Sequence, residues 1–583
     1  MSTKSMMMLL IILIVTLIGA GCATPPTPAP TQPPAKAPEP TKAPAPTTAP
    51  VATKAPEPTK APAPTTAPAA TKAPEPTKAA APAKPKELRY GLTLVVSGID
   101  PHVHSSSELG IPLTSVYDTL VYLTSDYKFV PGLAESWENP NATTYVFKLK
   151  KNVKFHDGTP FNAQAVKDNF DRIMDPATKS AKAITLLGPY KSTEVVDDFT
   201  VRVTFTKPYP SFFDSLASVY LGMASPTAFK KWGVTDYQMH QVGTGPFKFS
   251  EKEFVAKDTI VLEKNPDYNW GPSIYKHTGA PYLDRIVFKF YPDAATRSAA
   301  LETGAVQVMG EIPPQDAARL QKDSKYQIAI AKIPGPPLLA FINVANPPTD
   351  DLKVRQALLY GVDRKTIVKT IFFDLSPVAY GAWSAASMGY DKSVEAMYPY
   401  DPNKAKALLE EAGWKPGPDG IRVKDGKRLS LETYLQTWGF LQETSQMIQA
   451  QLKTIGVELK GQTVAFPAAV TAANEGKHHL MPWNLSATDP AYLSVLFHSA
   501  GGNNWSKVKS PELDKLLDDA AATLDVQKQL QLYGQVQRLA MEQALVLPIR
   551  DYTNFNGASA KVKGLTFDVH GWFPYFYDVT LDD

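Results

Sequence analysis

The chain has 583 residues, with 60 basic and 57 acidic side chains and a formal net charge of +3. This length exceeds what one hydrophobic core supports, so we expect at least two compact units. The first 86 residues hold nine lysines and three glutamates, and the remainder is slightly acidic. A body without concentrated basic charge argues against nucleic acid as a partner. The single cysteine excludes a disulfide framework and a cysteine-based metal site.

The N-terminus has the pattern of an export signal. Lys4 precedes a largely apolar run over residues 6–18, and Gly19-Ala20-Gly21-Cys22 follows it. The run is shorter than the ~20 residues that span a bilayer and has the length of a signal-peptide core. Small residues ending in cysteine resemble a bacterial lipobox, although glycine stands at position 19, where leucine is usual. We predict a signal peptide over residues 1–21 and a lipid anchor at Cys22, with a plain cleaved signal as the alternative.

Residues 22–86 form a predicted linker between this cysteine and the body. From residue 25 to residue 86, 20 of the 62 residues are proline. An 18-residue unit, KAPEPTKAPAPTTAPVAT, starts at Lys36, recurs with one change from Lys54 and returns in part from Lys72. The unit lacks the apolar side chains that a packed core needs. We therefore expect a disordered, extended tether.

The pattern from residue 87 onward is that of an α/β protein. Residues 88–92 predict a strand that runs into a turn, and the alternation over residues 145–149 predicts a half-buried strand. Residues 156–159, His-Asp-Gly-Thr, predict a hairpin-type turn. We prefer this to a catalytic His–Asp pair because adjacent side chains rarely converge. Asn162 is placed to cap the helix that follows.

Two histidine pairs and a glycine-rich stretch invite functional interpretations. His102 and His104 would share a face of a strand, so with a third ligand they could hold a metal; we favour no metal site. His478 and His479 lie in the polar stretch EGKHH and predict an exposed loop. The stretch VGTGPF from Val242 lacks the spacing of a phosphate-binding loop, so we predict a tight turn between strands.

A second compact unit is predicted to begin at residue 338. LLAFINV is an almost continuous apolar run, which indicates a buried strand, and ANPPTDD ends it. Asp351 and Asp363 are placed to cap two successive helices. Further on, a strand over residues 429–433, a helix and a strand over residues 457–459 predict one β-α-β unit.

Four blocks of the body also match a known family in their order. They are GIDPH at residues 98–102, PGLAESW to HDGTPF at residues 131–161, VGTGPF to NPDYNW at residues 242–270, and FINVANPPTDDLKVRQALLYGVDR from residue 341. They resemble the family-5 extracellular solute-binding proteins, the peptide-, nickel- and oligosaccharide-binding subunits of ABC importers. The resemblance implies an α/β, two-lobed periplasmic-binding-protein fold of the large type, with mixed sheets flanked by helices and an extra subdomain, preceded by the disordered proline-rich tether.

The resemblance also implies domain boundaries. Lobe I would span residues 87–337, with an inserted subdomain at about residues 118–220. Lobe II would span residues 338–549, and residues 550–583 would return to lobe I. Closure of the two lobes about the crossings between them would trap the ligand.

The segment from Trp483 to Pro490 resembles the ligand-facing loop of the family. In peptide binders, an aspartate four residues before the proline pairs with the α-ammonium of the peptide. Serine stands at this position here, and Asp489, three residues further on, is the alternative partner. A buried carboxylate–ammonium bond is stronger than a neutral one, so this departure puts recognition of free amines in doubt. The candidate ligand-binding residues are Ser105, Ser107, Trp483, Asn484, Ser486 and Asp489.

The resemblance implies a membrane-anchored, extracytoplasmic and monomeric binding protein that captures a small solute and delivers it to the permease subunits of an ABC transporter. An oligopeptide is the favoured solute, and an oligosaccharide- or nickel-binding member of the family is the alternative. We expect no cofactor and no nucleic-acid partner. The sequence has no G-x-S-x-G or H-E-x-x-H motif, so we expect no enzyme. The rival interpretation is an exported hydrolase that uses Asp489 with Glu108.

Overall fold

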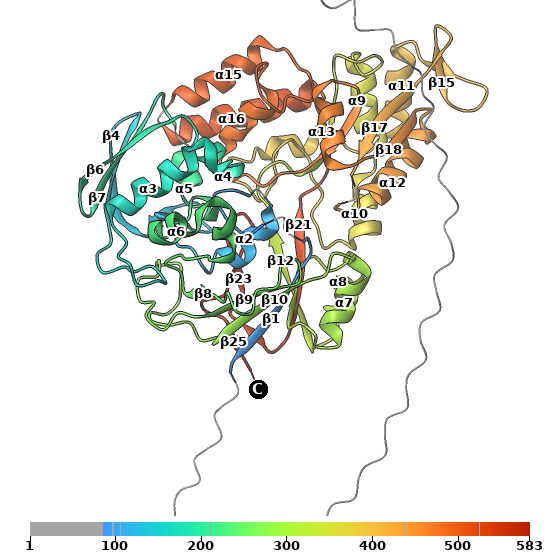
Figure 1. The fold of residues 1–583 in the computed structure, drawn as a ribbon. Helices are drawn as coiled ribbons and strands as arrows, with labels where there is room; N and C mark the ends of the chain where they lie inside the picture. Colours follow the sequence, from blue (N-terminus) through green and yellow to red (C-terminus); the bar gives the residue numbers. More distant parts are fainter. Residues whose placement is uncertain are drawn as a thin grey trace, which may run out of the picture. The chain divides into compact units, whose positions relative to one another are not determined.

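The structure is a computed structural model that describes residues 85–95, 98–104, 106–209, 211–436, 438–523 and 525–582. The predicted export signal, the candidate anchor Cys22, most of the linker and the candidate Ser105 lie outside these residues. Within the described ranges, no helix combines the length and the apolar character needed to cross a membrane. Helices and strands carry the labels of Figure 1.

In the described part of the chain, a seven-stranded mixed sheet, called here the first sheet, joins strands from the beginning, the middle and the end of the body. Its order is β12-β21-β11-β1-β10-β9-β8. Leu88, Tyr90 and Leu92 alternate along β1 and are buried, as the sequence period predicts. The bounds are β1 (Glu87–Leu92), β8 (Phe247–Phe249), β9 (Thr259–Lys264), β10 (Arg285–Phe290), β11 (Val308–Met309), β12 (Tyr326–Lys332) and β21 (Thr553–Ser559).

An antiparallel sheet, called here the third sheet, carries the predicted strand at residues 145–149. Its order is β4 (Ala134–Asn141), β5 (Thr144–Leu149), β7 (Thr200–Phe205) and β6 (Tyr190–Asp197). Tyr145, Phe147 and Leu149 are buried, which confirms the prediction. Helix α3 (Ala163–Met174) packs on this sheet, and the Asn162 side chain caps it by accepting a hydrogen bond from the Ala165 backbone N–H at 3.0 Å.

The second sheet forms from residues 338–550. Its order is β18 (Glu458–Thr463), β17 (Ser430–Leu435), β19 (Leu480–Trp483), β13 (Leu338–Ile342) and β20 (Val546–Arg550). Asp351 and Asp363 cap α9 (Leu352–Gly361) and α10 (Arg364–Phe372) with their side chains, as predicted. The predicted β-α-β unit is also confirmed, because β17 and β18 pair in parallel and α12 (Leu441–Thr454) connects them.

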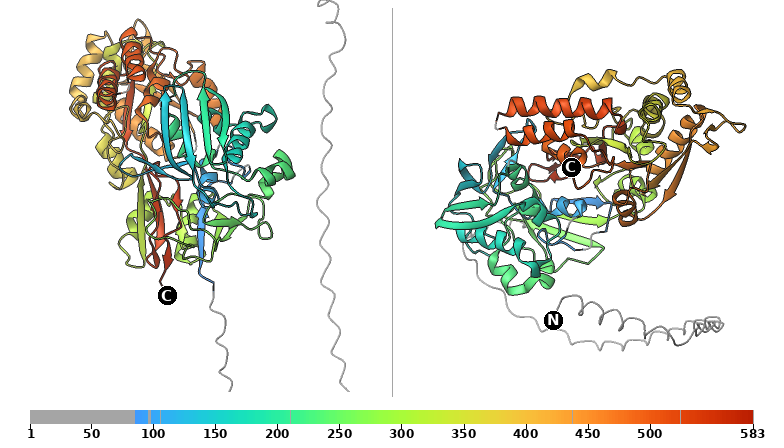
Figure 2. Two further views of the ribbon diagram at one scale, coloured as in Figure 1. Left: turned by 90° about the vertical axis from the view of Figure 1, so that its left-hand side faces the viewer. Right: turned by 90° about the horizontal axis from the view of Figure 1, so that it is seen from above.

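Further helices cover the sheets, and α15 and α16 pack side by side (Figures 1 and 2). These helices are α2 (Ser107–Leu113), α4 (Lys182–Leu187), α5 (Phe212–Leu216), α6 (Pro226–Asp236), α7 (Ala294–Glu302), α8 (Pro314–Leu320), α11 (Pro402–Glu411), α13 (Phe466–Asn474), α14 (Leu493–Phe497), α15 (Pro511–Ala522) and α16 (Val526–Glu542). Short 3-10 turns include η2 (Val219–Leu221), η3 (Tyr237–Met239) and η5 (Pro490–Tyr492). The short strands are β2 (Val121–Leu123), β3 (Phe129–Pro131), β14 (Lys415–Pro416), β15 (Arg422–Lys424), β16 (Lys427–Arg428), β22 (Val562–Lys563), β23 (Thr566–Phe567), β24 (Pro574–Tyr575) and β25 (Thr580–Leu581).

The chain passes between the first and the second sheet at two neighbouring places. Residues 333–337 join β12 to β13, and residues 551–552 join β20 to β21. The Ile333 N–H donates to the Tyr552 carbonyl at 3.0 Å, so the two connections are themselves paired. The first and third sheets share one hydrophobic core, and the second sheet has another. A smaller cluster joins Phe372 of α10 to Phe555 of β21.

The glycine-rich stretch from Val242 does not form the predicted turn between strands. It follows η3 and leads into β8, and its backbone lies against residues 115–116. A Cβ on Gly243 would lie 2.0 Å from the Val116 carbonyl oxygen, and one on Gly245 would lie 2.4 Å from the Ser115 carbonyl oxygen. The glycines therefore allow a close approach of two backbone segments.

The prediction that His478 and His479 lie in an exposed loop is wrong. Both are buried, and His478 has no exposed surface. The His478 Nε2 contacts the Trp505 carbonyl at 2.8 Å, and the His479 Nδ1 accepts from the Glu432 backbone N–H at 2.9 Å. The two rings tie the start of β19 to its neighbours. The polar sequence EGKHH does not indicate this burial, because the two imidazoles are buried through hydrogen bonds to backbone groups that lie far away in the chain.

The pKa of His478 predicts an acid-sensitive fold. Burial lowers this pKa to about 4 from the ordinary 6.5. Between these values the unfolded chain binds the proton and the folded chain does not, so the free energy of unfolding falls as the pH falls. The expected loss is about 2 kcal/mol between pH 7 and pH 5. Urea unfolding of the wild type and of His478→Gln at both pH values checks this. The variant should lack that part of the pH dependence, and equal pH dependence in the two proteins would contradict the prediction.

Candidate ligand-binding site

The candidate site is built on residues 483–490, called here the site segment, which begins at the last residue of β19 in the second sheet. The Ala487 N–H donates to the Pro334 carbonyl at 3.1 Å, and the Leu485 N–H lies 3.4 Å from the Pro336 carbonyl. The site segment therefore runs along the crossing at residues 333–337. Gly335, with φ of +104°, permits this approach, because a Cβ there would lie 2.5 Å from the Ala487 nitrogen.

Two polar contacts join the end of the site segment to the start of α5, on the side of the third sheet. The Thr488 hydroxyl donates to a carboxylate oxygen of Asp214, and the Ser211 hydroxyl donates to the Asp489 Oδ2 at 2.6 Å. The Asp489 Oδ1 accepts from the Ala491 backbone N–H at 2.8 Å and so caps η5. Both carboxylate oxygens of Asp489 are therefore engaged by groups of the protein.

Ser486 lies beside a histidine–aspartate pair near the C-terminus. Its hydroxyl donates to the His570 carbonyl at 3.2 Å, and the His570 Nδ1 lies 2.9 Å from the Asp568 Oδ2. Burial lowers the pKa of His570, but the Asp568 carboxylate outweighs this effect and holds that pKa above its ordinary value. Burial also raises the pKa of Asp214, with further contributions from Asp489 and Asp568. The surroundings of Ser486 are thus acidic although position 486 carries no charge.

The other candidates from the site segment are Trp483 and Asn484. Trp483 is 8% exposed and packs edge-on against Trp505, with ring centroids 4.5 Å apart. Its Nε1 has no hydrogen-bond partner among the residues that the structure describes. Phe466, an exposed side chain, lies against the same ring at 5.3 Å. Asn484 is half-buried.

Ser107 and Glu108 begin α2, and the structure does not describe the Ser107 side chain. The Glu108 carboxylate accepts hydrogen bonds from the Thr93 backbone N–H and, at 3.2 Å, from the Thr93 hydroxyl. Burial, with a contribution from Glu311, raises the pKa of Glu108 to about 7. Glu108 and Asp489 therefore have separate hydrogen-bond partners. The hydrolase interpretation requires the two carboxylates to act as a pair, and the structure does not pair them.

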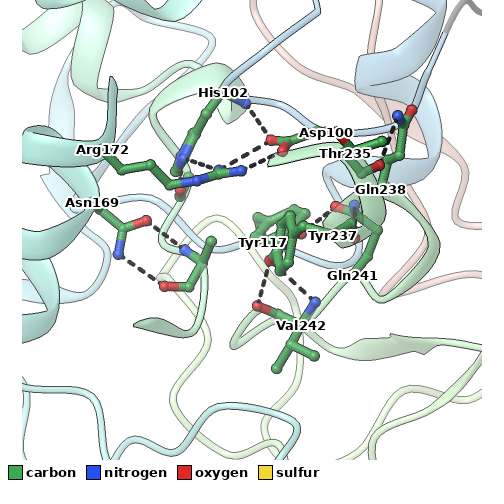
Figure 3. A network of polar contacts seen from close by, with 12 residues as sticks. Asp100, His102, Tyr117, Asn169, Arg172, Thr235, Tyr237, Gln238, Gln241 and Val242 are labelled. Atoms are coloured by element: carbon green, nitrogen blue, oxygen red, sulfur yellow. Dashed lines mark hydrogen bonds and ion pairs between the residues drawn. The ribbon is translucent and has the colours of Figure 1, made fainter. Parts of the chain in front are cut away.

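The motif GIDPH forms a buried polar network (Figure 3). The Asp100 carboxylate accepts from Arg172 of α3, with Nη2 2.5 Å from Oδ2. Arg172 also donates to the His102 Nδ1 at 2.8 Å, and the His102 Nε2 donates to the Gly222 carbonyl at 2.9 Å. Burial and the Arg172 charge lower the pKa of His102 to about 4. Both nitrogens of this neutral ring are used within the protein.

The metal interpretation places His102 and His104 on one face of a strand, but neither residue lies on a strand. Residues 101–103 form a turn, and His102 points into the network around Arg172 (Figure 3). Among the described residues, no group of three or more His, Cys, Asp or Glu side chains is placed to hold a metal ion. His102 instead joins Arg172 of α3 to the Gly222 carbonyl.

Sequence reasoning missed the partners that the fold brings to the site segment. Ser211, Asp214 and His570 belong to no recognisable motif, and the first two lie 278 and 274 residues away from Asp489 and Thr488. Tyr127 is a further example, because its hydroxyl donates to the Ala386 carbonyl at 2.8 Å across the same boundary.

The two sheets, their paired crossings and the site segment define a binding protein of the periplasmic-binding class. Comparison with known proteins gives the family. The profile described as "Bacterial extracellular solute-binding proteins, family 5 Middle" matches residues 128–506, and the chain belongs to this family. The resemblance seen in the four sequence blocks is thereby confirmed.

Individual proteins support the same assignment. The chain is 32% identical to the dipeptide-binding protein of Escherichia coli strain K12 over 519 residues, 83% of this chain and 92% of that protein. The crystal structure of NikA from Brucella suis with Fe(III)-EDTA matches with a TM-score of 0.75 and 25% identity, over 85% of this chain and all of the other. The oligopeptide-binding protein AppA of Bacillus subtilis, in complex with a nonapeptide, matches with a TM-score of 0.69 and 26% identity, over 86% of this chain and all of the other.

These matches confirm the α/β periplasmic-binding-protein fold. They also confirm that the chain is a solute-binding protein and not an enzyme, because the family and the named relative are binding proteins.

Proposed function

We propose that this protein captures a peptide or similar solute between two lobes outside the cytoplasm and delivers it to the permease subunits of an ABC importer. The observation that carries the proposal is the position of the site segment. It leaves the second sheet, follows the crossing at residues 333–337 and contacts α5 and His570 on the opposite side. A solute held there would be contacted from both sides.

The proposed lobes follow the sheets. Lobe I comprises residues 87–337 and 550–583, with an inserted subdomain at about residues 118–220, and lobe II comprises residues 338–549. The first and third sheets support lobe I, and the second sheet supports lobe II. Because only two short connections join them, rotation about residues 333–337 and 551–552 would open and close the molecule.

A peptide is the favoured solute because the dipeptide-binding protein of Escherichia coli and the nonapeptide complex of AppA are among the relatives. Ser107, Trp483, Asn484 and Ser486, with Ser105, are the proposed contacts, and the engaged carboxylate of Asp489 makes it a weaker partner for a ligand amine. Nickel chelates or oligosaccharides are the alternative, and the Fe(III)-EDTA complex of NikA supports a metal chelate as a ligand class.

Mass spectrometry of ligand released by denaturing freshly purified protein tests the proposal. We expect short peptides in the released fraction, and saturable binding of the same peptides in calorimetry. Incubation with peptides and glycans should leave them intact. Turnover of either class, or release of only non-peptide solutes, contradicts the proposal.

Removing the Thr488 hydroxyl should favour an open form. Thr488→Val keeps the side-chain shape but removes the donor to Asp214, and a hydrogen bond to a charged group contributes about 1.5–3 kcal/mol. The affinity for peptide should therefore fall roughly tenfold or more, and small-angle scattering should show a larger radius. Thr471→Val is the matched control, because the Thr471 hydroxyl is exposed and bonds only to the Pro467 carbonyl of its own helix. Equal affinities in the two variants would rule out this role.

Anchoring at Cys22 is the remaining part of the proposal. The apolar run before it and the small residues ending in cysteine favour a thioether-linked lipid, with residues 1–21 removed. Cys22→Ala should release the protein into the soluble extracytoplasmic fraction, whereas the wild type should sediment with membranes. Membrane association of the alanine variant would show that another segment anchors the chain.

A further inference from the structure

A small internal cavity lies between α12 and the second sheet. Its volume is about 20 Å³. Every residue that lines it is buried, and none of them belongs to the candidate site at residues 483–490. The lining residues are Ala340, Thr433, Leu441, Thr444, Ser445, Ile448, Leu459, Leu480, Pro482, Leu547 and Ile549.

Three hydroxyl groups interrupt this otherwise apolar lining. Thr433 belongs to β17, and Thr444 and Ser445 belong to α12. Their side chains are 1%, 1% and 5% exposed, and none of the three oxygen atoms has a hydrogen-bond partner among the described residues. Buried hydroxyls are normally bonded, and those on helices usually bond to the carbonyl one turn earlier. Three such groups around one cavity require a common explanation.

We propose that this cavity is an internal binding site for water, with one or two molecules bonded to Thr433, Thr444 and Ser445. A water molecule needs roughly 10–15 Å³ and two to four polar partners, and both conditions are met here. A hydroxyl can donate and accept, so three of them can complete the bonds of one molecule. The cavity is too small for a larger ligand, and neutral hydroxyls would not offset the desolvation of an ion.

The position of this water site gives it a structural consequence. A molecule bonded to both Thr433 and Thr444 links β17 to the first half of α12. The loop before α12 contains Gly439, whose Cβ position lies 3.3 Å from the Tyr552 hydroxyl. Tyr552 belongs to the crossing between the two sheets. The bound water therefore fixes the start of α12, directly after the loop that lies against Tyr552 of the crossing, and this role is independent of which solute the protein binds.

Substitutions that remove one hydroxyl without changing the shape test the proposal. With water bound, Thr433→Val and Thr444→Val each remove a partner of the water, and the folding equilibrium constant should fall roughly three- to tenfold in urea unfolding. If the cavity is dry, the same changes remove an unpaired polar group and the constant should rise. Thr454→Val is the control on α12, because its hydroxyl is exposed and bonds to the Gln451 carbonyl; we expect less than a twofold change.

A second measurement covers variants that fold poorly. Magnetic relaxation dispersion of water oxygen in the intact wild-type protein should detect a long-lived internal water, and a high-resolution crystal structure should show its density beside Thr433 and Thr444. Loss of that density in Thr444→Val supports the proposal. An empty cavity in the wild type, or a folding constant that rises or stays unchanged in both valine variants, overturns it.

Discussion

Replacing Arg172 by methionine should destabilise the protein by about 3–5 kcal/mol, the loss expected when one partner of a buried ion pair is removed. Arg172 and Asp100 have side chains that are 6% and 1% exposed. Without Arg172, the Asp100 carboxylate stays buried without its cation, and His102 loses the donor to its Nδ1. The rings of Phe229 and Tyr237, at 5.0 and 4.9 Å from the guanidinium, also lose a contact.

Urea unfolding followed by circular dichroism measures this loss. The matched control is Arg202→Met, because the Arg202–Glu194 pair lies on the third sheet with side chains 41% and 60% exposed. Exposed pairs contribute only about 0–1 kcal/mol, so this variant should unfold close to the wild type. Similar losses in both variants would mean that the network of Figure 3 contributes no more than a surface pair.

The second large effect concerns the uncharged residue at position 486. Ser486→Asp should strengthen the binding of peptides with a free α-amine by roughly ten- to hundredfold, because a charge-assisted bond contributes about 1.5–3 kcal/mol. The wild-type serine donates to the His570 carbonyl and offers no charge, and Asp489 is occupied by Ser211 and the Ala491 N–H. A new carboxylate there should also weaken uncharged ligands, since the nearby His570 ring is already paired with Asp568.

Calorimetry with matched free and N-acetylated peptides separates these effects. The aspartate variant should gain affinity for the free peptide alone, and the acetylated peptide serves as the control for any change in the shape of the site. If the wild type already prefers the free amine by tenfold or more, another acid recognises the amine, with Asp489 as the first candidate, and the interpretation of position 486 is wrong.

The sequence predicted those features whose causes are local. Asn162, Asp351 and Asp363 cap helices because a short acceptor side chain stands directly before an amphipathic run. The alternation in β5 and the β17–α12–β18 unit follow from the same short-range patterns. The four motif blocks were sufficient to indicate the family.

Features that depend on distant residues could not be predicted. The sequence offers Asp489 as a ligand contact, but its carboxylate accepts a hydrogen bond from Ser211, 278 residues earlier in the chain. The polar neighbours of His478 predict an exposed position, yet its ring contacts a backbone carbonyl 27 residues later in the chain. In both cases the tertiary fold brings the hydrogen-bond partner to the side chain, and no local sequence pattern predicts that partner.

The strand order of the first sheet also bears on the order in which this protein can fold. β12 pairs only with β21 in the described residues, and β21 is made from residues 553–559, near the end of the chain. During synthesis, β12 therefore has no neighbour in the sheet until residues 553–559 have been made. Such long-range pairing is slow to form. The first sheet, which also contains β1 at the start of the body, is therefore completed only after the second sheet has all of its strands.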